Sequence, residues 1–486
     1  MKLLRPLCGV LAVAAPLPAA AQIHSASPTK ESAPYPAAAA GDGATTGGYN
    51  LSRWAEDWRV FRDPAKRNDP IDRIKYLPLD DDGDVYLTFS GEARVRMNLT
   101  TNPQLRKSPA QRQDILRLVG GADLHLGANL RLYGEIAHGR IGGVNLGTPA
   151  ASLRNDFVLQ QYFAEAKGEI AGVDVGVRYG RQEFTDGPNL LISQRDNNTI
   201  RFVLNGVRAW ARGSKLRVDL FDFETTTLGD SGLGDDQPDK DRRFTGVTAG
   251  IVLPQSLFGG SKLYLDPFFW RRRNRVGTWG GVVAHAERFY AGARLWGDVG
   301  PVNLDWSFNR QYGEFNQRPI RALQVFAAQT VRIGKDAQAP RIGFHADYAS
   351  GGGAFGSGTL RNAYSPFGNN VYYSYGLFLT PTNLIAIAPN FSFTPAKSVR
   401  VTVEYQRSWR PNEQDAVYRA NTTAYAGTEL VPGKSVSQLA RAQIVYTIAP
   451  RLIFTGRAEY LKAGPVLRRA NYRDSAFLAG WLSFRF

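Results

Sequence analysis

Cysteine is almost absent from this sequence, and several classes of chemistry are excluded with it. The single cysteine, Cys8, lies in the first 21 residues, and only two methionines and five histidines occur among 486 residues. A disulfide, a thiol nucleophile and a cysteine-bound metal are therefore excluded from the rest of the chain. The histidines do not follow the HExxH spacing of zinc enzymes, and no GxSxG motif of serine hydrolases is present. We expect neither an enzyme nor a bound cofactor.

Long apolar runs are also missing after the first 21 positions, which excludes membrane-spanning helices. The first 21 residues themselves resemble a secretory signal peptide. Lys2 and Arg5 precede an apolar stretch from Leu7 to Leu17, and small residues lead up to Ala21. We expect cleavage after Ala21 and export of residues 22–486.

Acidic residues are outnumbered, with 59 Lys and Arg against 43 Asp and Glu, and the formal net charge is +16. On an exported protein this excess indicates an anionic partner, either a polyanionic substrate or the phosphates of lipopolysaccharide. Nucleic acid is not expected as a partner outside the cytoplasm.

Composition divides the exported chain into three parts. Residues 22–49 are rich in Ala, Pro, Ser, Thr and Gly and have no hydrophobic period, which predicts a disordered linker. Residues 50–84 are dense in charge and aromatic rings, with a short helical stretch predicted around Trp54 to Phe61, and we interpret them as a periplasmic lead-in segment. Residues 85–486 follow a two-residue period that predicts strands.

The strand pattern has one apolar and one polar face. Between Val85 and Leu99 every second residue is apolar or small, while the alternate positions are polar and include Arg94 and Arg96. A strand of about 10 residues with these two faces suits a membrane barrel, with lipid outside and water inside. A soluble sandwich can show the same period, so the period alone leaves both folds open.

The end of the chain favours the barrel. The segment from Phe477 to Phe486 places Leu478, Leu482, Phe484 and the terminal Phe486 on one face. Such an apolar edge would aggregate unless another strand paired with it. About 400 residues at about 10 per strand plus connections predict 16–18 antiparallel strands in a transmembrane β-barrel of the Gram-negative outer membrane.

A barrel of this size is expected to have short periplasmic turns, longer extracellular loops and an aqueous lumen. We see no sequence signal for an oligomer interface and expect a monomer in contact with outer-membrane lipid and lipopolysaccharide. The segments expected to be loops are 142–156, 225–241, 350–370 and 412–434.

Arginine is the residue type that carries functional information. Many arginines fall on the polar face of the predicted strands, where they avoid the cost of about 2–4 kcal/mol for a charge facing mid-bilayer lipid. Arginines that line a constriction select anions, because a guanidinium matches a carboxylate. The alternative is that they pair with lumen acids and only hold the wall. The candidates for contact with substrate include Arg94, Arg96, Arg400 and Arg457.

The segment 230–241, DSGLGDDQPDKD, superficially resembles a calcium loop. It lacks the DxDxDG spacing with a later Glu, so a solvated acidic loop is the better interpretation. Asp235 and Asp236 are kept as weak calcium candidates, and no other metal site is expected.

Three blocks of sequence resemble the alginate export family of outer-membrane porins. The blocks are EDW, RDPAKR and KYLPL at Glu56–Trp58, Arg62–Arg67 and Lys75–Leu79; YGRQEF, SQRDNNT and NGVRAWA at Tyr179–Phe184, Ser193–Thr199 and Asn205–Ala211; and the segment Asn390–Arg410. The resemblance implies a barrel of about 18 strands whose electropositive, arginine-lined pore passes a polyuronate chain outward.

Carried over by matching motif, the resemblance implies an anion path formed by Arg181, Gln182, Arg195 and Arg208, with Asp196 fixing an arginine by a salt bridge. Arg181 falls on the lipid-facing parity of its strand, so it needs a bulge or strand end near Gly180 to turn inward. Asn205 stands where the family pattern has an acidic residue.

Two functions remain open at this point. The first is a channel for an anionic substrate that exports an alginate-like exopolysaccharide, fed by a periplasmic export complex. The second is an uptake porin for small anionic sugars or organic acids. An outer-membrane enzyme such as a lipid hydrolase is the third class, and the missing catalytic constellation speaks against it.

Overall fold

The computed structural model describes Tyr35 and residues 46–186, 190–230 and 232–486. The predicted signal peptide and most of the predicted linker lie outside the described residues. No helix among the described residues is both long and apolar enough to cross a membrane.

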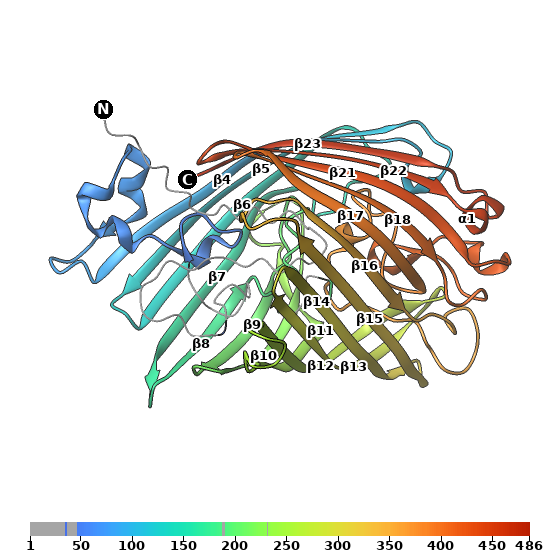
Figure 1. The fold of residues 1–486 in the computed structure, drawn as a ribbon, viewed down its shortest axis with the longest axis horizontal. Helices are drawn as coiled ribbons and strands as arrows, with labels where there is room; N and C mark the ends of the chain where they lie inside the picture. The colour runs from blue at the N-terminus through green and yellow to red at the C-terminus, as the bar shows by residue number, and fades with distance from the viewer. Residues whose placement is uncertain (1–34, 36–45, 187–189, 231) are drawn as a thin grey trace.

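Eighteen strands of the described chain pair antiparallel and close into one barrel (Figure 1). They are β4 (Val85–Thr100), β5 (Gln111–Leu126), β6 (Leu130–Val144), β7 (Asn155–Ile170), β8 (Val173–Gln182), β9 (Leu204–Arg212), β10 (Leu216–Thr227), β11 (Gln237–Val252), β12 (Lys262–Trp279), β13 (Val282–Val299), β14 (Val302–Phe315), β15 (Arg318–Arg332), β16 (Arg341–Ala349), β17 (Leu384–Ala396), β18 (Val399–Trp409), β21 (Ser435–Ala449), β22 (Leu452–Ala463) and β23 (Ser475–Arg485). The predicted all-β barrel is confirmed.

Closure pairs the last strand, β23, with the first, β4, so that Leu478 lies opposite Leu99 and Phe484 opposite Ala93. The apolar edge noted in the sequence is therefore paired. A short strand, β3 (Leu77–Pro78), adds to β4 at Leu87 and Tyr86.

The wall alternates as the two-residue period requires. On β4, Arg94 and Arg96 are 6% and 8% exposed, whereas Val95 and Met97 between and beside them are 54% and 48% exposed. The exposed apolar side chains form the outer surface of the barrel, and the buried charged ones face the lumen.

The two ends of the barrel differ in the length of their connections. At the end that holds β4 Val85 and the C-terminus, most turns have two or three residues; we call it the short-turn end. The opposite, long-loop end carries the connections 101–110, 145–154, 183–203, 228–236, 350–383, 410–434 and 464–474. It also has two tight hairpins, at 280–281 and 316–317, and all four predicted loops fall at this end.

The long loops contain only short elements. These are η5 (Pro103–Leu105), η6 (Asn370–Tyr372), η7 (Ala420–Thr422), η8 (Thr428–Leu430), the pair β19 (Tyr418–Arg419) and β20 (Thr423–Ala424), and the single α-helix α1 (Pro465–Arg469).

Two of these loops fold into the barrel, which corrects the expectation of a purely aqueous lumen. We call 183–203 the inward loop and 350–383 the second inward loop. They join through a bridge between Ile192 and Phe367. Both pack with buried lumen-facing rings such as Phe244, Trp270 and Tyr290 in one apolar cluster. The loops fill the lumen because their own apolar side chains are buried there.

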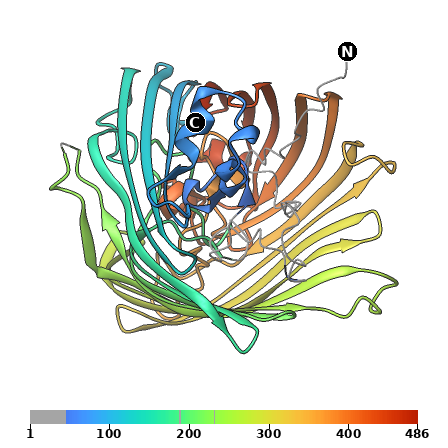
Figure 2. The ribbon, with the colours of Figure 1, turned by 90° about the vertical axis from the view of Figure 1, so that its left-hand side faces the viewer.

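The lead-in segment lies within the ring of strands at the short-turn end (Figure 2). It consists of β1 (Thr46–Gly47), η1 (Arg53–Ala55), β2 (Glu56–Asp57), η2 (Arg59–Arg62), η3 (Pro64–Lys66) and η4 (Pro70–Lys75). Trp54, 1% exposed, packs against Tyr133 and Phe163 of the wall.

The prediction of one short helix around Trp54 to Phe61 is wrong. Two short 3-10 turns occupy this stretch, and Glu56 and Asp57 between them are extended because they pair with Thr46 and Gly47.

Candidate functional site

The inward loop is held against the wall by Asp196 at its tip. One carboxylate oxygen of Asp196 lies 2.8 Å from Arg117 Nη2 and 2.8 Å from Arg201 Nη2, and the other lies 3.0 Å from Arg94 Nη2. Arg94 and Arg117 are opposed residues on β4 and β5 and also pair with Glu92. The two strands therefore present a pair of guanidinium groups to a single loop carboxylate.

This arrangement keeps Asp196 ionised. Burial alone would raise the pKa of its carboxyl, but the charges of Arg117, Arg94 and Arg201 outweigh burial and hold that pKa well below its usual value of 3.8. The ion pairs that fasten the loop are thus fully charged at neutral pH.

Asn197, next to Asp196, binds two arginines that have no carboxylate partner among the described residues. Its backbone carbonyl and its side-chain oxygen accept hydrogen bonds from Arg96 Nη1 at 3.0 and 3.1 Å, and the side-chain oxygen accepts one from Arg457 Nη1 at 3.2 Å. The two guanidinium groups each lie 4.9 Å from the ring of Trp481. Both arginines are held by neutral acceptors and an aromatic face.

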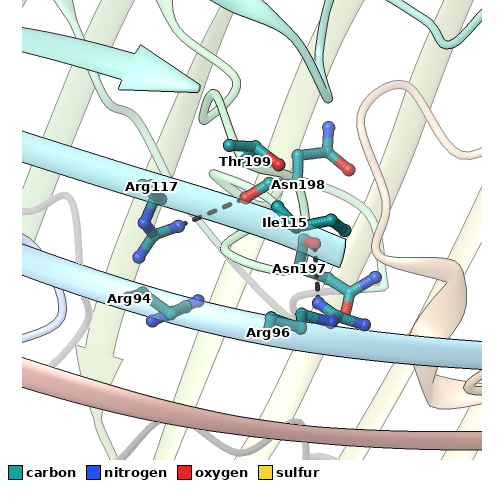
Figure 3. A pocket seen from close by; sticks show the side chains of 7 residues that line it. All are labelled: Arg94, Arg96, Ile115, Arg117, Asn197, Asn198 and Thr199. Atoms are coloured by element: carbon teal, nitrogen blue, oxygen red, sulfur yellow. Dashed lines mark hydrogen bonds between the residues drawn. The ribbon is translucent and has the colours of Figure 1, made fainter. Parts of the chain in front are cut away.

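A small hollow lies between the loop tip and the wall (Figure 3). Arg94 and Arg96 on β4 and Arg117 on β5 line one side, and loop residues Asn198 and Thr199 line the other. Its lining is rich in guanidinium groups, as an anion site requires.

The lead-in segment also contacts the inward loop. Arg201 donates to the carbonyl of Leu51 at 2.6 Å and pairs with Glu183 at 2.8 Å, in addition to Asp196. Arg53, on the lead-in segment, pairs with Glu92 at 3.1 Å and with Glu135 at 2.7 Å. The lead-in segment, inward loop and wall therefore share one network of buried ion pairs.

Many lumen arginines are neutralised by a carboxylate on their own or a neighbouring strand. We call these the neutralised arginines; the pairs are Arg131 with Asp123, Arg178 with Glu165, Arg208 with Asp219, Arg294 with Asp305, and Arg441 with Glu404. Their positive charge is cancelled locally, so they stabilise the wall.

Three arginines form a different group, which we call the arginine cluster: Arg195 of the inward loop, Arg272 of β12 and Arg288 of β13. Arg272 and Arg288 are directly opposed in the pairing of their strands. Like charges in opposed positions repel, and among the described residues no carboxylate forms an ion pair with any of the three. Instead, Arg272 donates to the carbonyl of Pro366 and Arg288 to that of Asn362.

The arginine cluster surrounds Tyr364 of the second inward loop and leaves hydrogen-bond donors unused. The centre of the Arg272 guanidinium lies 4.7 Å from the Tyr364 ring, and that of Arg288 lies 6.0 Å from it. Burial would raise the pKa of the Tyr364 hydroxyl, yet the charge of Arg272, its hydrogen bond to that hydroxyl, and the charges of Arg195 and Arg288 lower that pKa below its usual value. Within the described part of the chain, Arg195 Nε, Arg272 Nε and Arg288 Nη2 are buried without an acceptor. The cluster is a positive, donor-rich site.

The structure brings together four of the predicted site residues. Arg94, Arg96, Asp196 and Arg457 meet at the tip of the inward loop. Arg195, adjacent to Asp196, has a left-handed backbone (φ 54°) and extends toward Phe202, 5.1 Å from its ring. The predicted pairing of Asp196 with an arginine is present, with Arg94, Arg117 and Arg201 as partners.

Arg181 is placed elsewhere. Its three nitrogens donate to Asn205 Oδ1, to the carbonyl of Leu159 and to that of Asp236, each at 2.9 Å. It opposes Tyr162, a residue 41% exposed on the outer surface, and so has the parity of that face, although Arg181 itself is only 3% exposed. Gly180 has φ 138°, but the backbone there does not bring Arg181 to the other arginines.

The remaining predicted residues are also separate from the loop tip. Gln182 is fully buried and donates to the carbonyl of Gly206 at 3.2 Å. Arg208 is neutralised by Asp219, and Arg400 is exposed beside the turn at 397–398.

The acidic loop forms a local turn. Asp236 Oδ1 accepts from the Gly229 backbone at 3.0 Å and from Asn155 at 3.1 Å, and Asp235 accepts from the Asp230 backbone. The described residues contain no group of three or more His, Cys, Asp or Glu side chains suited to a metal ion. Calcium binding at Asp235 and Asp236 stays a prediction.

Three important residues were not among the sequence candidates: Arg201, Arg272 and Arg288. Arg201 follows the SQRDNNT motif by two positions, and that proximity was a usable signal. Arg272 lies within a run of three arginines, and its pairing with Arg288 depends on strand register, which the sequence does not reveal.

Comparison with known proteins gives a family and a fold. The family model described as "Alginate export" matches residues 85–480. A comparison with curated protein sequences finds no match.

Among solved structures, the chain resembles Pseudomonas aeruginosa OccK2 (OpdF) in complex with glucuronate, with 11% identity, a TM-score of 0.53 and coverage of 82% of this chain and 98% of that one. A BenF-like porin from Pseudomonas fluorescens Pf-5 has 11% identity to the chain and a TM-score of 0.53, with coverage of 82% of this chain and 99% of that one. Acinetobacter baumannii OccAB1 has 10% identity and a TM-score of 0.53, with coverage of 85% of this chain and 99% of that one. At these identities the likeness concerns the fold.

Proposed function

The chain belongs to the alginate export family, and from this premise we propose that it carries an anionic uronate polymer across the Gram-negative outer membrane, using its arginine cluster. The family and the fold are those of outer-membrane channels for anionic substrates. In such barrels the short turns face the periplasm and the long loops face the outside.

The arginine cluster is the observation that carries this proposal. Three guanidinium groups without a carboxylate, two of them directly opposed, are costly to the fold unless an anion neutralises them. Each has a buried donor without an acceptor. A uronate supplies a carboxylate for a guanidinium and hydroxyl groups for further hydrogen bonds. Aromatic rings such as Tyr364 and Phe367 beside Arg272 offer apolar faces to a sugar ring.

Planar-bilayer recording tests the substrate class. We expect anion selectivity in a salt gradient and block by alginate oligomers but not by neutral dextrins. The double variant Arg272→Met/Arg288→Met should lose most of the selectivity and bind the oligomers about tenfold more weakly. Arg407→Met, which removes one charge from the exposed β18 surface, is the control and should behave as wild type. Equal block of the wild type and the double variant would reject the arginine cluster as the binding element.

The direction of transport is tested in bacterial cells. A strain without this chain should retain uronate polymer in the periplasm and release less into the medium. If polymer release is unchanged but growth on small sugar acids is lost, the channel works in uptake.

Uptake of small organic anions is the second candidate, and the filling of the lumen favours it. The lead-in segment occupies the periplasmic mouth, and both inward loops occupy the lumen. A lumen filled in this way suits a single small acid better than a polymer chain. OccK2, which shares the fold, was solved in complex with glucuronate, a single sugar acid.

A further inference from the structure

The outer surface of the barrel carries an arginine pair that the transport function does not use. Arg310 on β14 and Arg321 on β15 have the lipid-facing parity and are exposed. Arg310 opposes Leu323, and Arg321 opposes Tyr312, two residues further along β14. The two arginines are therefore diagonal neighbours across adjacent strands, close enough for their long side chains to reach one ligand. We call them the outer arginine pair.

Within the described ranges, neither guanidinium of the outer arginine pair contacts a protein acceptor. Among the residues that the structure describes, no side chain or carbonyl forms a hydrogen bond or ion pair with either one. Other outward arginines nearby are paired, since Arg243 contacts Asp222 and Arg271 contacts Glu287. The outer arginine pair therefore offers a full set of donors on a surface that contacts lipid.

The position of the pair along the strands sets its depth. β14 runs from the short-turn end at Val302 to the hairpin at 316–317, and its outward residues Trp306 and Phe308 are 44% and 49% exposed. Arg310 comes next, followed by Tyr312, whose ring stacks on Phe289 at 5.3 Å. Arg310 thus lies between the apolar band and an aromatic girdle on the long-loop side.

An arginine at this level faces the outer leaflet, where the anions are the phosphates of lipopolysaccharide. Arginine binds phosphate through its planar fork, and two arginines can hold one phosphate from two sides. The exposed side chains of Trp306 and Phe308 lie below, where the acyl chains of the same lipid would run. Glu314, the next outward residue after Tyr312, is the other diagonal neighbour of Arg321, and among the described residues the two form no ion pair.

We propose that Arg310 and Arg321 form a binding site for the phosphorylated glucosamine headgroup of one lipopolysaccharide molecule. Arg243 on β11 and Arg273 on β12 are also opposed on the outer surface, but Arg243 contacts Asp222 and Arg273 lies opposite Glu287 of β13. Exposed outward cations elsewhere, such as Arg140 on β6, Arg407 on β18 and Lys462 on β22, are on strands that do not adjoin one another.

Lipid binding to the purified, folded full-length protein tests this site. Native mass spectrometry in detergent would count bound bisphosphorylated lipid A during a titration, for the wild type and for Arg310→Gln/Arg321→Gln. The matched control is Arg140→Gln/Arg407→Gln, which removes two exposed outward arginines from other faces. A second titration uses dephosphorylated lipid A, and a third adds inorganic phosphate as a competitor.

We expect the double variant at the outer arginine pair to bind bisphosphorylated lipid A at least about tenfold more weakly than the wild type and the control variant. Dephosphorylated lipid A should bind the wild type as weakly as bisphosphorylated lipid A binds the double variant. Millimolar inorganic phosphate should not displace bisphosphorylated lipid A from the wild type. The single variant Arg321→Gln should show an intermediate loss of lipid A binding. It replaces the double variant in the test if the double variant does not fold. Equal binding by the two double variants, or by the two forms of lipid A, would overturn the proposal. If inorganic phosphate alone displaces the lipid, the outer arginine pair is a simple phosphate site and the proposal is overturned.

Discussion

The neutralised arginines and the arginine cluster occupy the same lumen but meet opposite surroundings. Arg294 contacts both oxygens of Asp305 at 2.7 Å, whereas Arg272 has a second arginine, Arg288, directly opposite. The charges of the neutralised arginines are paired by carboxylates on the strands of the wall itself. The arginine cluster leaves charge and donors available, so it costs stability and can bind an anion. The presence of arginine in a lumen therefore says little about selectivity until its partners are known.

Breaking a neutralised pair should give the largest effect on stability. Arg294→Met leaves Asp305 as a buried, unpaired charge, and we expect the free energy of unfolding to fall by about 3–5 kcal/mol. Arg272→Met removes a repulsive charge, and stability should stay equal or rise. Urea unfolding of the refolded barrel measures both. A comparable loss for the two variants would end the distinction between the groups.

Asp196 sharpens the comparison because it neutralises loop and wall arginines together. Asp196→Asn leaves Arg94, Arg117 and Arg201 crowded without their shared carboxylate, so the inward loop should detach from the wall. We expect a stability loss of about 2–3 kcal/mol and a larger single-channel conductance. The control Asp235→Asn alters a carboxylate of the loop 228–236 and should leave conductance unchanged. An unchanged conductance in Asp196→Asn would show that other contacts suffice to hold the loop.

The partly exposed Arg451 should matter much less. Its Nη2 lies 2.6 Å from Asp72 and it also contacts Asp69, but its side chain is 19% exposed and that of Asp69 is 38% exposed. Solvent screens such pairs, and Arg451→Gln should cost about 0–1 kcal/mol. Arg53→Gln, which cuts the buried contacts of the lead-in segment to Glu92 and Glu135, should cost several times more by the same unfolding measurement.

Mild acid should have the smallest effect. The folded state lowers the pKa of Asp196 well below 3.8, so its contribution to stability is complete above the unfolded pKa and is lost only as pH falls through the lower, folded pKa. Single-channel conductance at pH 4 should equal that at pH 7. A conductance step between pH 4 and pH 5 would mean that Asp196 is not held by three arginines.

The wall of the barrel was predictable because it follows from a local rule. The alternation along Val85 to Leu99 predicts which side chains of β4 face inward, and the apolar last strand predicts closure. The tip of the inward loop was partly predictable, since Asp196 lies in a motif resembling the family's. What lay beyond the sequence was long-range register. The opposition of Arg272 and Arg288, and the position of Arg181 beside Tyr162, depend on how strands align.

The filling of the lumen was not predictable for a related reason. The two-residue period describes strands, but it carries no information on where a 34-residue connection such as 350–383 goes. That loop folds inward because apolar residues including Phe367 and Tyr372 find lumen-facing rings, and those rings lie on strands distant from it in sequence. Loop burial is a tertiary property.

Closure of β23 on β4 has a consequence for the order of folding. Thr100 pairs with Phe477, so the first wall strand waits for the last before its outer edge is satisfied. Contacts between residues so far apart in sequence form slowly, because a long chain must be brought together before they contribute. The lead-in segment and both inward loops lie inside the ring. Glu92 and Arg94 of β4 contact the lead-in segment and the inward loop, so the strand at the seam also joins the wall to the contents of the lumen.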